Sequence, residues 1–371
     1  MEVVVVGFVE FREFGDYRNI MTDHIFEKLI SLENLFSCWQ EFRQGKGGKP
    51  DVLAFERYLE DNVFDLHTDL SVGTYRHLPY KTFHINDPKH RIISKAAVRD
   101  RLVHHAVFNQ LYRIFDRTFI FHSYSSRLGK GTHLAVGNLA RSLRQVSRNY
   151  THPAFVLKCD IRKFFQSVSH QKLLQIIQNK IKDSQFLWLI EEVVKSFFSP
   201  VDNPQQRERE LRGIPPGNLT SQIFANMYLN ELDQFVKHKL RVKHYFRYAD
   251  DFVIVHFDPV HLKAILRRLN EYLGANLLLE LHPSKVTIRK LWQGIDFLGY
   301  AILPYHIVLR TKTRARMFRK LFEKQKFFDA GILDKYGLNQ SVQLYLGMLK
   351  HCNGYELSRT LRNNFLPRNG S

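Results

Sequence analysis

Residues 244–257 read HYFRYADDFVIVHF, with the adjacent acids Asp250 and Asp251 at the centre of the stretch. The flanking runs, His244–Tyr248 and Phe252–Phe257, are rich in aromatic and β-branched residues, which predicts two strands joined by a hairpin turn at the acids. Two carboxylates between apolar strands repel each other and lose hydration, so a fold tolerates them when a cation lies between them. The alternative is an exposed acidic turn, because a Tyr-x-Asp-Asp string also arises by chance.

A third carboxylate decides between these interpretations. Asp160 ends the apolar run Ala154–Asp160, which we expect to be a buried strand. Phosphoryl transfer through two metal ions needs several carboxylates that converge on ions about 3.5–4 Å apart. For Asp160 alone, a strand-end acid or helix cap is the simpler explanation. Together with the acidic hairpin, it predicts a magnesium site made of oxygen ligands.

The composition indicates the size of the hydrophobic core and the kind of molecule that the protein binds. Of the 371 residues 44% are hydrophobic, which is enough for a sizeable core and more than one lobe. A net charge of +19 indicates a polyanionic partner, because each neutralised phosphate releases counterions; a merely solvated basic surface is the alternative.

Two further observations concern the cellular compartment. Cys38, Cys159 and Cys352 lie too far apart for a disulfide framework or a zinc site, so we expect a reducing cytoplasm. The apolar opening Met1–Val9 is short and begins with an acid, so it predicts a small strand or an extension, not a signal peptide or a membrane span.

Several segments offer groups for an anionic ligand. A helix predicted from Val98 has its apolar residues on one face, which leaves Arg99 available for phosphates or for Asp100. The polar region 121–133 contains Arg127 and Lys130. The segment 213–222 opens another helix, with Asn218 or Thr220 as its N-cap, and its glycines let backbone approach a ligand.

The segment 310–326 reads RTKTRARMFRKLFEKQK, in which eight basic residues face one acid. Met317, Phe318, Leu321 and Phe322 form an apolar stripe within it, which predicts a helix with one packed face and one basic face.

The order of these motifs resembles the fingers and palm of a prokaryotic reverse transcriptase, over nearly the whole chain. The resemblance is carried by Lys89-His90-Arg91, Val98-Arg99-Asp100-Arg101, Ser123-Tyr124 with Arg127, Lys158-Cys159-Asp160-Ile161 with Phe164-Phe165, Gly217 with Ser221-Gln222, Tyr248-Ala249-Asp250-Asp251, Lys285-Val286-Thr287 and Phe297-Leu298-Gly299-Tyr300. It implies an α+β right-hand polymerase. Its parts would be an N-terminal extension (1–24), fingers (25–150 with part of 185–215), a palm with an antiparallel sheet (151–305) and a short helical thumb (306–371).

The segment 217–222 (GNLTSQ), together with 230–233 (NELD), is similar to the reverse transcriptases of diversity-generating retroelements. That family copies a template RNA into adenine-mutagenised cDNA with the help of a small accessory variability protein. This chain has Pro216 where the family usually has an aliphatic residue. Because proline offers no N–H and no side-chain donor, we expect weaker discrimination against mismatches.

The resemblance implies a role for each catalytic position. Asp160, Asp250 and Asp251, with the backbone of Ile161, would hold two Mg²⁺ ions, for which Mn²⁺ can substitute. Lys285 would protonate the departing pyrophosphate, although a solvated lysine is the alternative.

The resemblance also implies a nucleotide pocket. Lys89 and Arg91 would neutralise the triphosphate of the incoming dNTP, unless Arg91 only forms a surface salt bridge. Phe165 would exclude a ribose 2′-hydroxyl. The alternative is a core position for Phe165, because one of the two adjacent residues Phe164 and Phe165 should point inward. Pro216 and Gly217 would form the floor of the pocket. Positions expected to contact the template RNA and the cDNA or primer are Arg99, Arg127, Lys130, Gly299, Arg314, Arg316, Arg319 and Lys320.

Two other interpretations stay open. One is a group II intron-type or defence-associated reverse transcriptase, although the segment after Tyr300 is short for the maturase-like and endonuclease domains of intron enzymes. The other is a non-catalytic RNA-binding scaffold, which has no reason to keep three mutually repelling acids.

Overall fold

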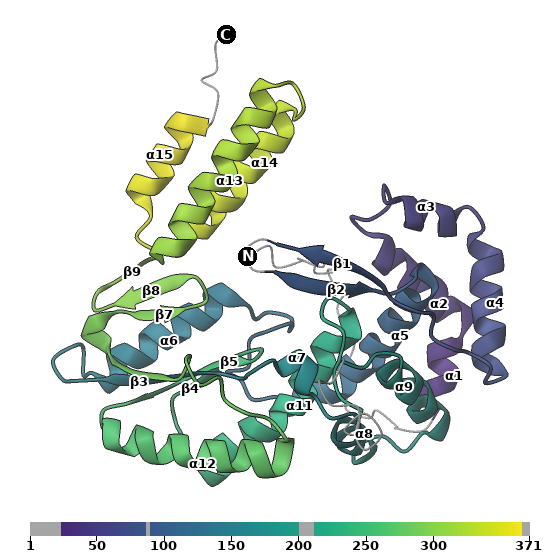
Figure 1. Cartoon of the computed structure of the whole chain (residues 1–371), viewed down its shortest axis with the longest axis horizontal. Helices are drawn as coiled ribbons and strands as arrows, with labels where there is room; N and C mark the ends of the chain where they lie inside the picture. Colours follow the sequence, from purple (N-terminus) through teal and green to yellow (C-terminus); the bar gives the residue numbers. More distant parts are fainter. Residues whose placement is uncertain (1–23, 87–89, 200–210, 366–371) are drawn as a thin grey trace. The chain divides into compact units, whose positions relative to one another are not determined.

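The computed structural model describes residues 24–86, 90–199 and 211–365. They form two compact units, each built from separate stretches of sequence (Figure 1). The first unit combines the described residues up to Phe121 with Ile161–Arg241 and Leu269–Pro283, and the second combines His122–Asp160, Val242–Arg268 and the described residues from Ser284. Residues 1–23 of the predicted extension, Lys89 and residues 200–210 of the predicted fingers lie outside the described residues.

The first unit is mainly helical. Helix α5 is buried on nearly all sides because α2 and α11 both pack against it. The elements of this unit are α1 (Ile25–Ile30), α2 (Leu32–Arg43), α3 (Pro50–Glu56), α4 (Leu59–Ser71), the hairpin β1 (Lys81–Ile85) and β2 (Arg91–Lys95), α5 (Val98–Phe115), η1 (Asp116–Thr118), α7 (Phe164–Ser167), α8 (His170–Gln178), α9 (Ser184–Lys195), α11 (Leu219–Gln234) and the π-helical turn η2 (Phe235–Lys239).

The second unit contains two antiparallel sheets, in the orders β4-β5-β3-β6 and β7-β8-β9. Its elements are α6 (Thr132–Val146), β3 (Phe155–Asp160), β4 (Tyr245–Tyr248), β5 (Asp251–His256), β6 (Thr287–Lys290), η3 (Leu291–Gln293), β7 (Ile295–Phe297), β8 (Tyr300–Leu303), β9 (His306–Leu309), α13 (Thr311–Asp329), α14 (Lys335–Leu349) and α15 (Tyr355–Phe365). Helix α12 (Pro259–Leu277) has residues in both units.

One continuous core holds the second unit together. Val156, Phe246, Val253 and Val255 of the larger sheet share it with the apolar face of α6, with β7–β9 and with the buried residues of α13–α15. Side chains alternate between the two faces of a strand, so Leu157 and its counterparts on β5 lie on the opposite face, where they are also buried. Burial on both faces explains the nearly unbroken apolar runs of β3 and β5.

Most predicted elements are confirmed. The acidic hairpin is formed by β4 and β5, and the predicted α+β class with an antiparallel sheet is correct. Asn218 does occupy the N-cap of α11, but its side chain donates to the Ser94 carbonyl (3.2 Å) and accepts no hydrogen bond from the helix N–H groups. Among the described residues, no helix is both long and apolar enough to cross a membrane.

Candidate active site

The antiparallel register of the larger sheet places two of the three predicted acids side by side on neighbouring strands. Asp160, the last residue of β3, pairs with Asp251, the first residue of β5. Directly paired residues have Cβ atoms about 4.5–5.5 Å apart and project from the same face. The pairing of Tyr248 with Asp251 leaves only Ala249 and Asp250 in the hairpin turn. All three acids therefore lie at one end of the sheet.

The electrostatics of this acid cluster (Asp160, Asp250 and Asp251) are unfavourable without a counter-charge. Burial, followed by repulsion from Asp251 and Asp160, raises the pKa of Asp250 to about 6. Burial is also the main cause of the raised pKa of Asp251, which the nearby Lys158 opposes. The cluster thus favours protonation or a bound cation.

Two lysines lie beside the acid cluster. The Nζ atom of Lys285 is 2.7 Å from Oδ1 of Asp160. Lys158 was missed as a site residue, although it precedes Asp160 by two positions and so projects from the same face of β3. Its Nζ atom donates to the carbonyl of Asp296 (3.2 Å) at β7. Lys158 therefore links the acid cluster to the smaller sheet.

The hairpin turn is held from inside the protein by Arg247, which the sequence analysis did not identify. This arginine is fully buried, and its guanidinium donates to the Ala249 carbonyl (3.2 Å) and to the Ser123 hydroxyl (3.0 Å). Ala249 has a φ of +52°, a left-handed conformation that is strained for a residue with a Cβ atom. The buried guanidinium thus stabilises the conformation that places Asp250 next to Asp251.

The donor set fits a hard divalent cation. It consists of carboxylate oxygens only, which are the ligands that Mg²⁺ prefers. Burial, followed by repulsion from Asp251, raises the pKa of Asp250, and a bound cation would compensate the charge of the ionised carboxylate. Within residues 24–86, 90–199 and 211–365, no three carboxylate, imidazole or thiolate side chains already converge as a metal site. The backbone of Ile161, the other predicted ligand, forms an isolated antiparallel bridge with Leu281.

The first unit brings together most of the predicted nucleotide pocket. One of the two adjacent phenylalanines points inward, as expected: Phe164 is buried and Phe165 is partly exposed. The Phe165 carbonyl accepts from Ile214 N–H (2.7 Å). Gly217 has a φ of +103°, and a Cβ atom there would lie 3.2 Å from Ile93 of β2. The loop with Pro216 and Gly217 therefore lies against β2, the strand that begins with the exposed Arg91.

Two predicted contacts with nucleic acid need correction. Arg127 is buried and donates to the Ser123 carbonyl (3.0 Å), so it supports the fold and is not available to a phosphate. Arg99 pairs with Asp69, lies over the Tyr75 ring (4.8 Å to the centroid) and is 3.8 Å from Oδ1 of Asp100, the alternative partner named above. In both cases a partner within the protein, Asp69 for Arg99 and the Ser123 carbonyl for Arg127, binds the guanidinium that was expected to contact a phosphate.

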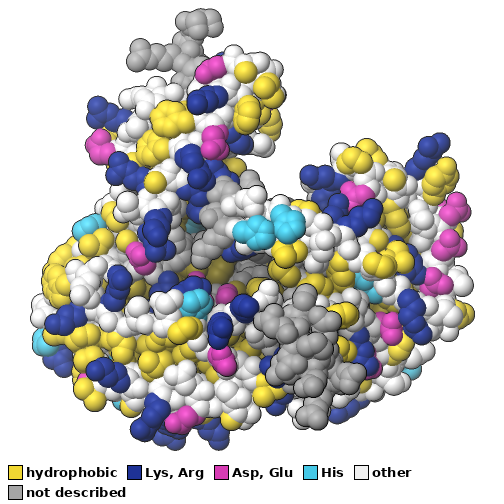
Figure 2. Space-filling view, in the orientation of Figure 1, with side chains coloured by type: hydrophobic (Ala, Val, Ile, Leu, Met, Phe, Trp, Pro, Cys, Tyr) yellow, Lys and Arg dark blue, Asp and Glu magenta, His cyan; other side chains and the backbone are white. Residues whose placement is uncertain are grey.

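The other predicted contacts lie in the turn before α6, in the turn between β7 and β8, and on α13. Lys130 lies over the ring of the buried Tyr124 (5.9 Å), and Gly299 has a φ of +89° in the turn between β7 and β8. On α13, Met317 and Leu321 are buried, whereas Phe322 of the predicted apolar stripe is 53% exposed. Figure 2 shows Lys and Arg side chains over this helical segment. The four residues of α13 that are predicted to contact nucleic acid, Arg314, Arg316, Arg319 and Lys320, are all exposed or partly exposed.

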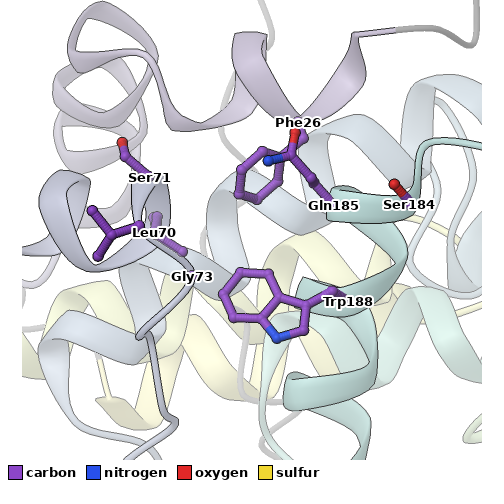
Figure 3. A pocket seen from close by; sticks show the side chains of 8 residues that line it. Phe26, Leu70, Ser71, Gly73, Ser184, Gln185 and Trp188 are labelled. Carbon is purple, nitrogen blue, oxygen red and sulfur yellow. The ribbon is translucent and has the colours of Figure 1, made fainter.

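A surface pocket of about 310 Å³ lies elsewhere in the first unit (Figure 3). Phe26 of α1, Trp188 of α9 and the turn after α4 around Gly73 line it. None of the predicted site residues lines this pocket, so it carries no part of the candidate active site.

The sequence matches one protein-family model and is similar to several known proteins. A sequence model described as reverse transcriptase (RNA-dependent DNA polymerase) matches residues 84–302. Protein YkfC of Escherichia coli strain K12 is 26% identical over 272 residues, which cover 64% of this chain and 70% of YkfC. The group II intron-encoded protein LtrA of Lactococcus lactis subsp. cremoris is 27% identical over 277 residues, which cover 72% of this chain but only 43% of LtrA.

Similarity also extends to a solved structure. Telomerase from Candida albicans, in complex with a TWJ fragment of telomeric RNA, aligns with a TM-score of 0.45 and 14% identity, over 80% of this chain and 57% of that chain.

Proposed function

Because the chain belongs to the reverse transcriptase family, the RNA-dependent DNA polymerases, we propose that Asp160, Asp250 and Asp251 form the centre in which it adds deoxynucleotides to a primer on an RNA template. The observation that carries this proposal is the pairing of Asp160 with Asp251 beside the turn that contains Asp250. The family match spans all three positions.

The acid cluster would hold two divalent metal ions, Mg²⁺ or Mn²⁺, with the backbone of Ile161 as a further ligand. When bound, such ions lower the pKa of the primer 3′-hydroxyl and stabilise the charge that develops on the phosphates. Lys285 holds a proton at Nζ, 2.7 Å from Asp160, and delivers it to the departing pyrophosphate.

The residues of the first unit bind and select the nucleotide. Arg91, with Lys89, neutralises the triphosphate, since a guanidinium can donate to two phosphate oxygens at once. Phe165 occupies the space that a ribose 2′-hydroxyl would need, and its partial exposure beside the buried Phe164 supports this role. Pro216 and Gly217 form the floor under the base.

The division into fingers (25–150 with part of 185–215), palm (151–305) and thumb (306–371) belongs to the same proposal. The basic face of α13 follows the phosphates of the template–primer duplex, because surface cations that release counterions contribute affinity without sequence specificity.

We further propose that the enzyme is of the diversity-generating retroelement type and works with a small accessory protein. Support comes from the segments 217–222 and 230–233, which open and continue α11. Proline at position 216 has no N–H and no side-chain donor with which to align the templating pair, which favours error-prone copying.

A group II intron-type enzyme is the second candidate, and the similarity to LtrA favours it. The two candidates differ in the frequency and the position of the copying errors that we expect in the cDNA. Errors concentrated opposite template adenines support the retroelement type, whereas evenly spread, infrequent errors support the intron type.

The experiment that tests the function is primer extension on a defined RNA template with Mg²⁺ and all four dNTPs, followed by sequencing of the cDNA. Pro216→Gln is the comparison for the retroelement type. We expect it to lower the misincorporation rate opposite adenine, and equal error rates in the two proteins would contradict the role of Pro216.

A further inference from the structure

A chain of hydrogen bonds crosses the interior of the first unit and ends at the nucleotide loop. Nε2 of His77 lies 3.0 Å from Nε2 of His104, and Nδ1 of His104 lies 2.5 Å from the hydroxyl of Thr220. At the other end, Nδ1 of His77 lies 2.6 Å from the carbonyl of Leu78. His104 and Thr220 are buried, as is the side chain of His77. No predicted catalytic role uses these groups.

The chemistry of the partners fixes the direction of every bond in the chain. A carbonyl can only accept, so Nδ1 of His77 carries the hydrogen and, in the neutral ring, its Nε2 accepts. His104 must then donate from Nε2, which leaves its Nδ1 as the acceptor for the Thr220 hydroxyl. Both rings are neutral because burial lowers the pKa of His77 and lowers that of His104 to about 3.

One end of the chain is anchored to a buried carboxylate. The Leu78 N–H donates to Oδ2 of Asp100 (3.1 Å), and the Tyr75 hydroxyl donates to Oδ1 of the same residue (2.8 Å). Asp100 is fully buried in the first turn of α5. This end therefore belongs to the rigid part of the unit.

The other end reaches the loop that we propose as the floor of the nucleotide pocket. Thr220 lies in the first turn of α11, directly after the loop with Gly217 and Asn218. Asn218 donates to the Ser94 carbonyl of β2, and Gly217 approaches Ile93 of the same strand. The loop is thus held by β2 on one side and by Thr220 on the other.

We propose that His77 and His104 are positioning residues, which fix Pro216 and Gly217 against β2 through the hydroxyl of Thr220 and so set the affinity for the incoming dNTP. The proposal rests on the nucleotide-binding role proposed above. The chain touches no reacting atom, so its loss changes the KM for dNTP and leaves kcat nearly unchanged.

Thr220→Val tests the proposal because valine has nearly the same size and shape but carries a methyl group in place of the hydroxyl, so it cannot donate to His104. Its matched control is Ser221→Ala, since the neighbouring hydroxyl is also buried and has no hydrogen-bond partner among the described residues. We expect Thr220→Val to raise the KM for dNTP about tenfold, with kcat within about twofold of wild type. Thr220→Ser, which keeps the hydroxyl, should restore most of the affinity.

A KM in Thr220→Val equal to that of the wild type would overturn the proposal. So would equal effects of Thr220→Val and Ser221→Ala, because a merely structural role of the helix turn does not distinguish the two hydroxyls. Circular dichroism of each variant shows whether the change in KM occurs in a folded protein.

Imidazole ¹⁵N NMR spectra of the wild-type protein provide a test that needs neither a folded variant nor activity. We expect the Nδ1–H tautomer for His77 and the Nε2–H tautomer for His104 at pH 7. The opposite tautomers, or a charged ring, would contradict the chain. Absence of primer extension by the wild type would instead count against the proposed function, so the two failures are distinguishable.

Discussion

The ammonium nitrogen of Lys285 lies 2.7 Å from Oδ1 of Asp160, at the end of the sheet where Asp160 pairs with Asp251. A positive side chain thus directly contacts the acid cluster from the segment that leads into β6.

Lys285→Met should lower kcat by about 10²–10⁴-fold, because it removes the proposed proton donor for pyrophosphate. Lys285→Arg keeps the charge beside Asp160 but holds its proton too tightly to release it, so we expect it to restore nucleotide binding and not kcat. Rapid-quench primer extension measures both constants. Lys290→Met, at the exposed end of β6, is the control, and equal effects at the two positions would disprove the catalytic role.

Asp250→Asn should stabilise the fold at neutral pH without divalent metal. The pKa of Asp250 in the folded protein is about 6 and its ordinary value is 3.8, so the folded state binds this proton more tightly than the unfolded state. The contribution of Asp250 to stability is therefore present below pH 3.8 and is lost as the pH rises through about 6. We expect the variant to gain about 1–3 kcal/mol in the free energy of unfolding at pH 7.5.

Urea unfolding in EDTA at pH 5 and pH 7.5 measures this gain, which should shrink at the lower pH. Added Mg²⁺ should stabilise the wild type more than the variant, because the cation binds the folded acid cluster. Asp258→Asn, whose side chain accepts from Val260 N–H at the start of α12, is the control and should show little change. A variant less stable than wild type at pH 7.5 would rule out repulsion within the cluster.

Phe165→Val should raise incorporation of ribonucleotides relative to deoxynucleotides by about tenfold or more, since it opens the space that excludes a 2′-hydroxyl. Phe164→Leu is the matched control. Phe164 is only 2% exposed, so its truncation should lower the free energy of unfolding by about 1–3 kcal/mol and leave sugar selectivity unchanged. If the two variants have the same sugar selectivity, Phe165 is a core residue and not a gate.

Arg314→Ala and Arg319→Ala should each weaken binding of a template–primer duplex and lower the slope of log K against log salt by about one. Both residues are exposed on α13. Fluorescence anisotropy at several salt concentrations gives the slope. Lys263→Ala on α12 is the control for a general loss of charge, and an equal change in slope there would argue against a specific duplex-binding face.

The strongly patterned elements could be predicted from the sequence, because period-two and helical patterns report which faces are buried. The hairpin around Asp250, the strand that ends at Asp160 and the amphipathic helix α13 are examples. The sequence also predicted that one of the adjacent residues Phe164 and Phe165 points inward, but only the structure shows that it is Phe164.

Side-chain partners supplied by distant segments could not be predicted. Arg99 pairs with Asp69, 30 residues away, which local spacing does not encode. Arg127 donates to the carbonyl of Ser123, only four residues away, but its burial depends on the surrounding fold. Arg247 has the residue type of an exposed position, yet it is fully buried because the turn carbonyl and Ser123 satisfy its donors. Lys158 could have been found by counting two residues back from Asp160 along the strand.

The most direct test of the central claim is single-turnover extension of a DNA primer on an RNA template in Mg²⁺, comparing the wild type with Asp251→Asn and with the control Asp258→Asn. We expect the wild type and Asp258→Asn to extend the primer at similar rates, and Asp251→Asn, although folded, to yield no detectable product. Extension by Asp251→Asn at a rate close to that of the wild type would contradict the assignment of the acid cluster as the catalytic centre.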